Sequence, residues 1–203
     1  MMRFTLLIFF LIGASLQAFS QVKPIYFNGD RVTTNAEQAT SYGVYGKLNE
    51  QELWVLKRYD LDDNLMFSGA YKDELLTKPH GKFIFYASIL DYNYQNFANF
   101  KNTNTDRYIS QQGEYIDGLE EGKWTDYFPD GRLMGYRNYL NGKLNGETVL
   151  FNYKGRRMFV GQYTNGLKTG TWYNLKKKVK DVFDNDKLIS TTKLTKAEIL
   201  AIE

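Results

Sequence analysis

The sequence of 203 residues has no cysteine, one histidine and only three prolines. Without cysteine, the chain has no disulfide, no thiolate zinc site and no cysteine nucleophile. Because His80 is the single histidine, a multi-histidine metal site is excluded, and a His-containing catalytic triad would have to use this residue. The charges nearly balance, with 26 Lys and Arg against 23 Asp and Glu, so the composition does not indicate a dedicated nucleic-acid binder.

The first twenty residues have the three parts of a secretory signal peptide. Residues 1–3 are a short positive start, 4–16 are an apolar run, and small residues at 18 and 20 precede a cleavage point before Gln21. The run is shorter than the ~20 apolar residues that a membrane-spanning helix needs. We therefore expect a signal peptide at 1–20 and an exported mature chain with no transmembrane segment, located in the periplasm, on the cell surface or outside the cell.

A 24-residue repeat organises the second half of the chain. Tyrosines and glycines recur at this step, in three sets: Tyr115, Tyr139 and Tyr163; Gly118, Gly142 and Gly166; Gly122, Gly146 and Gly170. Each unit contains a β-prone run, a turn such as Pro-Asp-Gly at 129–131, a returning strand and a second turn such as Asn-Gly at 141–142. The pattern predicts an all-β protein, an elongated and twisted stack of antiparallel β-hairpin repeats with a short C-terminal capping helix.

The repeat divides the chain into segments. After the signal peptide we expect an N-terminal strand and loop segment at 21–50, degenerate hairpin repeats at 51–86, an Asn- and Tyr-rich insertion at 87–110, regular repeats at 111–175, and a last strand and C-terminal cap at 176–203. An insertion into a repeat array often carries function; the alternative is a tolerated or disordered loop. At the C-terminus, 182–189 is predicted to form one more strand, with a turn at 184–186. Thr195 and Glu198 fit a capping box for a helix that would cover the last open sheet edge.

Two segments of the repeat carry a family resemblance. Residues 113–124 (GEYIDGLEEGKW) and 161–172 (GQYTNGLKTGTW) resemble the MORN (membrane occupation and recognition nexus) repeat, in particular its bacterial variant. The middle copy departs from the motif, with Arg137 in place of the first glycine and Thr148 in place of tryptophan. The match covers roughly 110–175 well and 54–86 weakly.

The resemblance implies an elongated stack of hairpins that acts as an interaction scaffold. Some members of the family associate with membranes or phosphoinositides, and many bacterial relatives carry an antitoxin label. That label fits an exported chain poorly, because an exported protein does not meet a cytosolic toxin. The motif is specific for architecture and says little about chemistry.

Aromatic and lysine side chains are the candidate binding surface. The residues chosen are Trp124, Tyr127, Trp172, Tyr173, Lys176, Lys177 and Lys178. For the recurring tyrosines and tryptophans the core is the favoured role, because aromatic side chains bury the most area per residue in a thin sheet. The lysines would either meet an anionic surface such as lipid headgroups or protect an edge strand against unwanted pairing; the edge-strand role is favoured.

Two further clusters are interpreted as structural. Asp60, Asp62 and Asn64 offer oxygen atoms at alternate positions, as a calcium loop does, but the sharp-turn glycine and bidentate glutamate of such a loop are missing. By register this segment corresponds to the turn at 129–131. His80 precedes a turn glycine, and no serine or aspartate stands out as its partner. The sequence therefore predicts no catalytic residue, no cofactor and no metal site.

Three functions remain open at this stage. The first is a non-enzymatic protein-binding scaffold in the cell envelope, whose partner is another envelope or secreted protein. The second is a binder of cell-wall polysaccharide or of an anionic lipid surface through exposed aromatics and lysines. The third, an enzyme, would need a cluster of acid, base and nucleophile. No such cluster recurs or concentrates in the sequence, and carboxylate pairs such as Glu120 and Glu121 are what the enzyme hypothesis has left. The sequence favours the scaffold.

Overall fold

The computed structural model describes residues 23–48, 52–101 and 105–202. In chain order, the strands are β1 (Lys23–Asn28), β2 (Arg31–Thr33), β3 (Ser41–Leu48), β4 (Leu53–Asp60), β5 (Leu65–Tyr71), β6 (Pro79–Ser88), β7 (Arg107–Ile116), β8 (Leu119–Tyr127), β9 (Leu133–Leu140), β10 (Lys143–Phe151), β11 (Arg157–Thr164), β12 (Leu167–Asn174), β13 (Val179–Asp184) and β14 (Lys187–Lys193). The helices are η1 (Ala36–Gln38, a 3-10 turn), α1 (Ile89–Asn96) and α2 (Lys196–Ile202).

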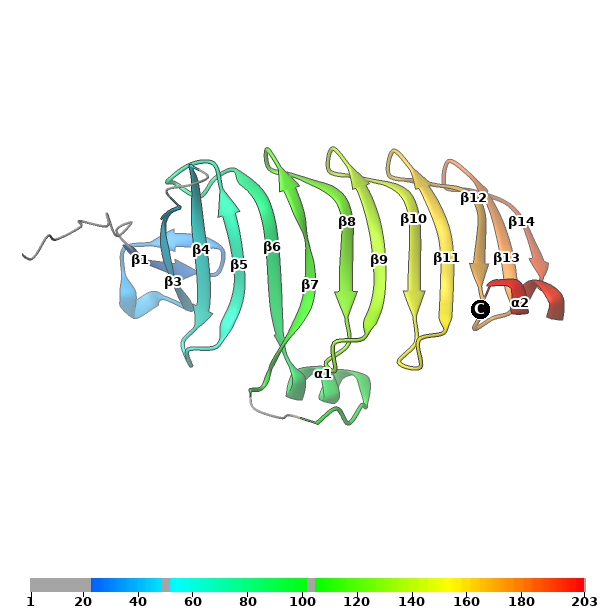
Figure 1. Ribbon diagram of the computed structural model, residues 1–203, viewed down its shortest axis with the longest axis horizontal. Coiled ribbons are helices and arrows are strands. Elements are labelled where there is room, and N and C mark those ends of the chain that lie inside the picture. Colours follow the sequence, from blue (N-terminus) through cyan, green and yellow to red (C-terminus); the bar gives the residue numbers. More distant parts are fainter. Residues whose placement is uncertain (1–22, 49–51, 102–104, 203) are drawn as a thin grey trace, which may run out of the picture.

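All the strands belong to one antiparallel sheet, which forms an elongated single layer (Figure 1). Neighbours in the sheet are neighbours in the sequence from β3 to β14, and only the start departs, since β1 lies between β3 and β2. The sheet is open, with β2 at one end and β14 at the other. The predicted all-β stack of antiparallel hairpins with a short C-terminal helix is thus confirmed.

Two-residue turns close the repeat hairpins at one end. In the β9–β10 turn, Asn141 and Gly142 both lie in the left-handed region, with φ of 51° and 74°. Turns of this kind match the twist of the flanking strands. The N–H of Gly142 donates to the carbonyl of Glu120 in the preceding hairpin at 2.9 Å, and the N–H of Gly166 donates to Leu144 in the same way at 2.7 Å. Successive hairpins are therefore tied together at their turns as well as along their strands.

The core consists of large side chains that lie over glycines on a neighbouring strand. The pairs are Leu56 with Gly43, Phe83 with Gly69, Trp124 with Gly113, and Trp172 with Gly161. A Cβ atom on Gly113 would lie 2.1 Å from Cδ2 of Trp124, so only glycine leaves room for this ring. The rings of Tyr115 and Tyr139 meet Trp124 edge-on, at centroid distances of 5.0 and 6.2 Å. The recurring tyrosines and tryptophans therefore pack mainly against one another.

The middle copy of the repeat replaces this packing with an ion pair. Arg137 pairs with Thr148 across the β9–β10 ladder, in the positions that glycine and tryptophan hold in the other copies. The guanidinium of Arg137 donates to both carboxylate oxygens of Asp126, at 3.0 and 2.9 Å. The departure from the motif thus interrupts the row of aromatic side chains without interrupting the sheet.

A buried arginine fixes the N-terminal end. Arg58 is buried in β4 and donates from Nε to the hydroxyl of Ser41 at 2.8 Å. Its guanidinium also donates to the Gly29 carbonyl and to Asp30, and lies 4.3 Å from the centroid of the Phe27 ring. The N-terminal segment, expected as a strand and loop at 21–50, therefore joins the same sheet through β1, β2 and β3.

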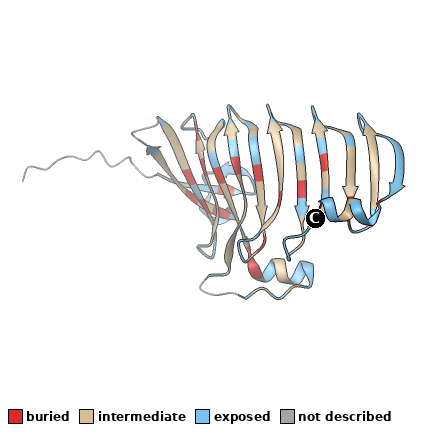
Figure 2. Ribbon diagram, turned by 45° about the vertical axis from the view of Figure 1, so that its right-hand side comes forward, coloured by how far each residue is buried: buried red, intermediate tan, exposed pale blue. Residues whose placement is uncertain are grey.

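The C-terminal helix forms as expected but lies elsewhere than expected. The capping box of α2 is present, because the Glu198 N–H donates to Thr195 Oγ1 at 3.2 Å and the Thr195 N–H donates to Glu198 Oε2 at 2.8 Å. Glu198 pairs with Lys180 of β13, and Arg157 of β11 donates to the Ile202 carbonyl at 3.0 Å. The helix thus lies over a face of β11 and β13. The expectation that it covers the last edge is wrong, since all seven residues of β14 are exposed (Figure 2).

The insertion is largely a folded element. The expected range 87–110 includes the last residues of β6 and the first of β7, and the segment between them begins with α1 (Figure 1). Ser88 caps this helix by accepting the Asp91 N–H at 3.0 Å. The first two N–H groups of the helix donate to Asp106: the Ile89 N–H to its carbonyl oxygen and the Leu90 N–H to its carboxylate, at 2.9 Å each.

The expected signal peptide at 1–20 lies outside the described residues. None of the helices in the described part of the chain is long and apolar enough to cross a membrane.

Candidate functional site

The two predicted tryptophans lie on one face of the sheet and belong to the packing over the glycines. Trp124 is only 3% exposed, and its Nε1 donates to the Glu114 carbonyl at 3.2 Å. Trp172 is half-buried, with the Tyr163 ring edge-on at 4.9 Å and the Phe183 ring at 6.2 Å. Trp124 is therefore a core residue, as the favoured interpretation of the recurring aromatic positions has it.

The two predicted tyrosines point to the opposite face. Side chains alternate along a strand, so Tyr127 and Tyr173 lie on the other side of the sheet from Trp124 and Trp172. The Tyr127 hydroxyl is engaged by Thr125 at 3.0 Å and by the Gln112 amide. Tyr173 is paired across the ladder with Val160 and Lys180, beneath the region where α2 lies.

The three predicted lysines are exposed residues of the β12–β13 turn. The N–H of Lys177 donates to Asn174 Oδ1 at 2.9 Å, and Lys178 has the positive φ of a turn residue. The favoured interpretation of the lysines as edge-strand residues is therefore wrong, because the edge strand is β14, which begins and ends with Lys187 and Lys193. The seven predicted residues do not form one surface: they divide between two faces and a turn.

Both clusters interpreted as structural have their polar atoms bonded to neighbouring turns or strands, and His80 lies in β6 rather than in a turn. The Asp60 carboxylate accepts the N–H groups of Asp62 and Asn64 at 3.0 and 2.8 Å and pairs with Arg107. Nδ1 of His80 accepts the Asp117 N–H at 3.2 Å. In the described residues, no group of three or more His, Cys, Asp or Glu side chains is placed to hold a metal ion.

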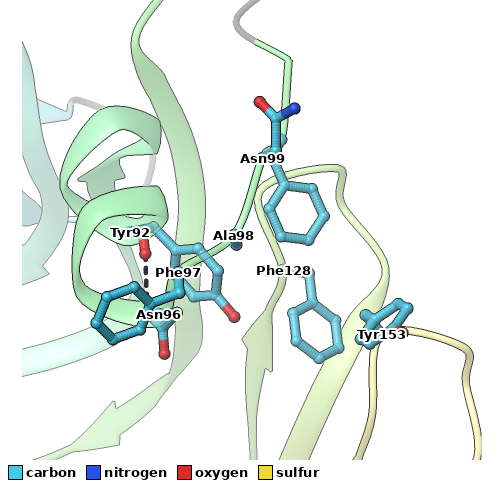
Figure 3. Close-up of a pocket in the computed structure, with 8 residues that line it drawn as sticks. Tyr92, Asn96, Phe97, Ala98, Asn99, Phe128 and Tyr153 are labelled. Carbon is cyan, nitrogen blue, oxygen red and sulfur yellow. Dashed lines mark hydrogen bonds between the residues drawn. The ribbon is translucent and has the colours of Figure 1, made fainter.

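An aromatic-walled cavity of about 560 Å³ lies between the insertion and two turns of the repeat array (Figure 3). Its lining comes from α1, the segment after it, and the β8–β9 and β10–β11 turns: Tyr92, Asn96, Phe97, Ala98, Asn99, Phe100, Phe128 and Tyr153. Phe100 stacks on Phe128 at a centroid distance of 6.3 Å, and the Tyr92 ring meets Phe100 edge-on at 5.6 Å. The lining contains aromatic rings, two asparagine amides and two phenol groups, and it contains no charged side chain.

The wall that the insertion contributes is held by its own hydrogen bonds. The Asn93 amide donates to the Phe100 carbonyl at 2.9 Å and accepts the Phe100 N–H at 2.8 Å. These two bonds close the segment that follows α1 and place the Phe100 ring against Phe128. Burial, together with the nearby charge of Asp130, raises the pKa of the Tyr92 hydroxyl above its usual value of 10.0, so this group is a neutral hydrogen-bonding partner at physiological pH.

Exposed aromatic side chains lie in the cavity lining, at Phe97 and Tyr153, and elsewhere on α1, at Tyr94. Phe97 is 99% exposed, and its φ of 50° places a bulky residue in the left-handed region, which such residues rarely adopt. Tyr94 on α1 is 86% exposed, and Tyr153 at the cavity rim is 56% exposed. Phe97 is the C-cap of α1, and its left-handed conformation ends the helix there with its ring exposed to solvent.

The second candidate feature is the free edge of β14. This strand pairs with β13 and with no other described strand, and its side chains, including Leu188 and Ile189, are exposed on both faces. At the other end of the sheet, β2 has only three residues. The two ends of the array therefore differ in what they offer to a partner.

Comparison with known proteins finds no relative: no protein-family model and no curated protein matches the chain.

The structure identifies two features, the aromatic cavity and the free edge of β14, that the sequence reasoning did not select. The pocket residues Tyr92 and Phe100 fall in the Asn- and Tyr-rich stretch, which was recognised only as an insertion. Phe128 and Tyr153 belong to turns of the repeat. An aromatic residue in each of these two turns was the sequence feature that could have pointed to the cavity.

Proposed function

We propose that this protein is an exported, non-enzymatic scaffold of the cell envelope that binds another envelope or secreted protein along the edge of β14. The observation that carries the proposal is the exposed, unpaired edge of β14 at the end of a continuous sheet. Export rests on the signal-like first twenty residues. The resemblance to the MORN repeat, whose members are mostly interaction scaffolds, supports the same function.

The edge suits the addition of a strand from a partner. An open edge presents backbone N–H and C=O groups in a row, and an extended segment satisfies them by continuing the ladder. The strand is seven residues long and carries Leu188 and Ile189 between lysines at its two ends. The complementary partner segment is therefore extended, apolar in its centre and acidic at its ends.

Pre-organisation favours binding at this edge. β14 is held by six ladder positions to β13, and the β13–β14 turn is tied to β12 through the Asp186 N–H, which donates to the Lys168 carbonyl at 3.0 Å. A strand that is already ordered loses little conformational entropy when a partner joins it.

Proline at Thr191 tests the edge. The Leu194 N–H donates to Lys178, on the β13 side, and backbone groups alternate in direction along a strand, so the Thr191 N–H points away from β13. Thr191→Pro therefore removes a hydrogen-bond donor from the free edge while leaving the β13 ladder in place. Thr191→Val is the matched control, because it also loses the hydroxyl that bonds Asp181 at 2.6 Å but keeps the N–H.

The measurement is a pull-down with residues 21–203 from envelope extract, with and without protease treatment of the extract, followed by crosslinking from β14. The proposal expects a protease-sensitive partner that crosslinks to β14, is retained by Thr191→Val and is reduced at least about tenfold by Thr191→Pro. Equal capture by both variants, or capture of protease-resistant material alone, would contradict it. A dimer of this chain in light scattering that Thr191→Pro abolishes would also contradict it, because a second copy would then occupy the edge.

A further inference from the structure

We infer that the aromatic cavity between the insertion and the β8–β9 and β10–β11 turns binds a neutral oligosaccharide. This site is separate from the β14 edge and goes beyond the scaffold function. It also differs from the polysaccharide hypothesis made from sequence, which assigned binding to the repeated aromatics, since those residues include the buried Trp124.

The chemistry of the lining points to a ligand that is ring-shaped, hydroxylated and uncharged. A sugar ring presents C–H groups on its faces, which pack on aromatic rings, and hydroxyl groups at its edge, which need hydrogen-bonding partners. Tyr92, Phe128 and Tyr153 provide rings around the cavity, and the Tyr92 and Tyr153 hydroxyls provide polar ends (Figure 3). A charged ligand would have no charged side chain among the lining residues to pair with.

The two asparagines distinguish a sugar from an apolar side chain. Asn96 donates its Nδ2 to the Tyr92 carbonyl at 2.9 Å, so its amide oxygen remains available as an acceptor. Asn99 makes no side-chain hydrogen bond with another described residue, although it lines the cavity. An apolar peptide side chain would cover these amides without satisfying them, which carries a free-energy penalty. Sugar hydroxyls satisfy both.

The cavity is also of suitable size and rigidity. Its volume of about 560 Å³ lies within the roughly 300–1,000 Å³ typical of small-molecule sites. The Asn93 bonds to Phe100 and the stack of Phe100 on Phe128 are formed without a ligand. Phe97, exposed and held at positive φ beside the cavity, adds a further ring that a second sugar unit can contact.

Titration of the full mature chain with defined oligosaccharides tests the site. The probes are neutral hexamers of glucose in α-1,4 and β-1,4 linkage, of mannose and of N-acetylglucosamine, with binding followed by calorimetry and by saturation-transfer NMR. Tyr153→Ala and Asn99→Ala alter exposed positions of the lining and leave the core untouched. Tyr94→Ala is the matched control, because it removes an even more exposed tyrosine from the same insertion without changing the lining.

The expected result is saturable binding of at least one hexamer that Tyr153→Ala weakens about tenfold and Tyr94→Ala leaves unchanged. Asn99→Ala should weaken binding to a smaller extent, and Thr191→Pro at the β14 edge should have no effect. The inference is overturned if no hexamer binds, if Tyr94→Ala weakens binding as much as Tyr153→Ala, or if an uncharged Phe- and Leu-rich hexapeptide competes at the same site. These outcomes leave the scaffold proposal untouched, since that proposal is tested through β14.

Discussion

At the scale of single residues, the fold depends on glycines that make room for large rings. Gly113 is buried in β7 and does not have a positive φ, so its role is to provide space for the Trp124 ring rather than conformational freedom. Such a position is as specific as a core residue, because the side chain it lacks is what permits the close approach. The middle copy supports this, since Arg137 in the glycine position occurs with Thr148 in the tryptophan position.

Adding one methyl group at Gly113 should therefore destabilise the protein. Gly113→Ala forces Trp124 to move, and overpacking of this kind costs about 1–3 kcal/mol. The free energy of unfolding from urea denaturation measures the loss. Glu114→Ala, at the exposed neighbouring position, is the control and should change stability by less than about 0.5 kcal/mol. Equal effects of the two changes would show that Trp124 does not need the space.

At the scale of elements, α2 is held to the sheet by a carboxylate that has two roles. The Glu198 side chain accepts a hydrogen bond from Lys180 and also accepts the N–H and hydroxyl of Thr195. These bonds lower the pKa of Glu198 from 4.5 to about 2. The bond from Lys180 contributes most to this shift, and the bonds from Thr195 come next.

The depressed pKa predicts how α2 responds to acid. Because the folded protein holds the Glu198 proton less tightly than the unfolded chain does, this contribution is present above about pH 4.5 and is lost as the pH falls toward 2. NMR titration of the Glu198 carboxyl should give a midpoint near 2, and amide exchange in α2 should accelerate over the same range. Lys180→Met should move the midpoint up toward 4.5. A midpoint near 4.5 in the unaltered protein would contradict the contacts of α2.

At the scale of the whole molecule, stability depends on neighbouring strands. The sheet is a single layer in which β3 to β14 each pair with the strands next to them in sequence. The buried cluster of Phe27, Leu56, Tyr71, Phe83 and Trp124 lies entirely between β1 and β8. The C-terminal end of the array has a smaller share of the buried side chains, as Figure 2 shows for β14 and α2.

Unfolding should therefore begin at the C-terminal end. In arrays of this kind stability is a sum of local terms, so regions open separately. We expect hydrogen exchange of the β12–β13 amides to be at least about tenfold faster than that of the β5–β7 amides, a difference of ~1.4 kcal/mol. Val149→Ala, at a fully buried position in β10, should accelerate exchange in β9–β11 and leave β4–β6 unchanged. Uniform exchange along the sheet, or a uniform response to Val149→Ala, would indicate a single cooperative unit.

The repeat architecture follows from local sequence patterns. The 24-residue step and the Asn-Gly and Pro-Asp-Gly turns act locally, through backbone conformations that few residues adopt, so hairpins and their order follow from neighbouring residues. The capping box at Thr195 and Glu198 was predicted for the same reason, since its bonds lie within one helical turn. The turn role of Asp60 also followed from its place in the register, whereas the turn role predicted for His80 is wrong, since His80 lies in β6.

Contacts between residues far apart in the chain set which aromatics are buried, where α2 lies and what the insertion forms. Both faces of a one-layer sheet carry apolar residues, so alternation does not tell whether Trp124 is core or surface; its place over Gly113 does. The cavity depends on Phe100 meeting Phe128 and Tyr153, which lie 28 and 53 residues further along the chain, and no local pattern encodes contacts of that range. The β14 edge is likewise free because α2 lies on a face of the sheet, where it contacts Lys180 and Arg157. These are contacts between elements far apart in the sequence.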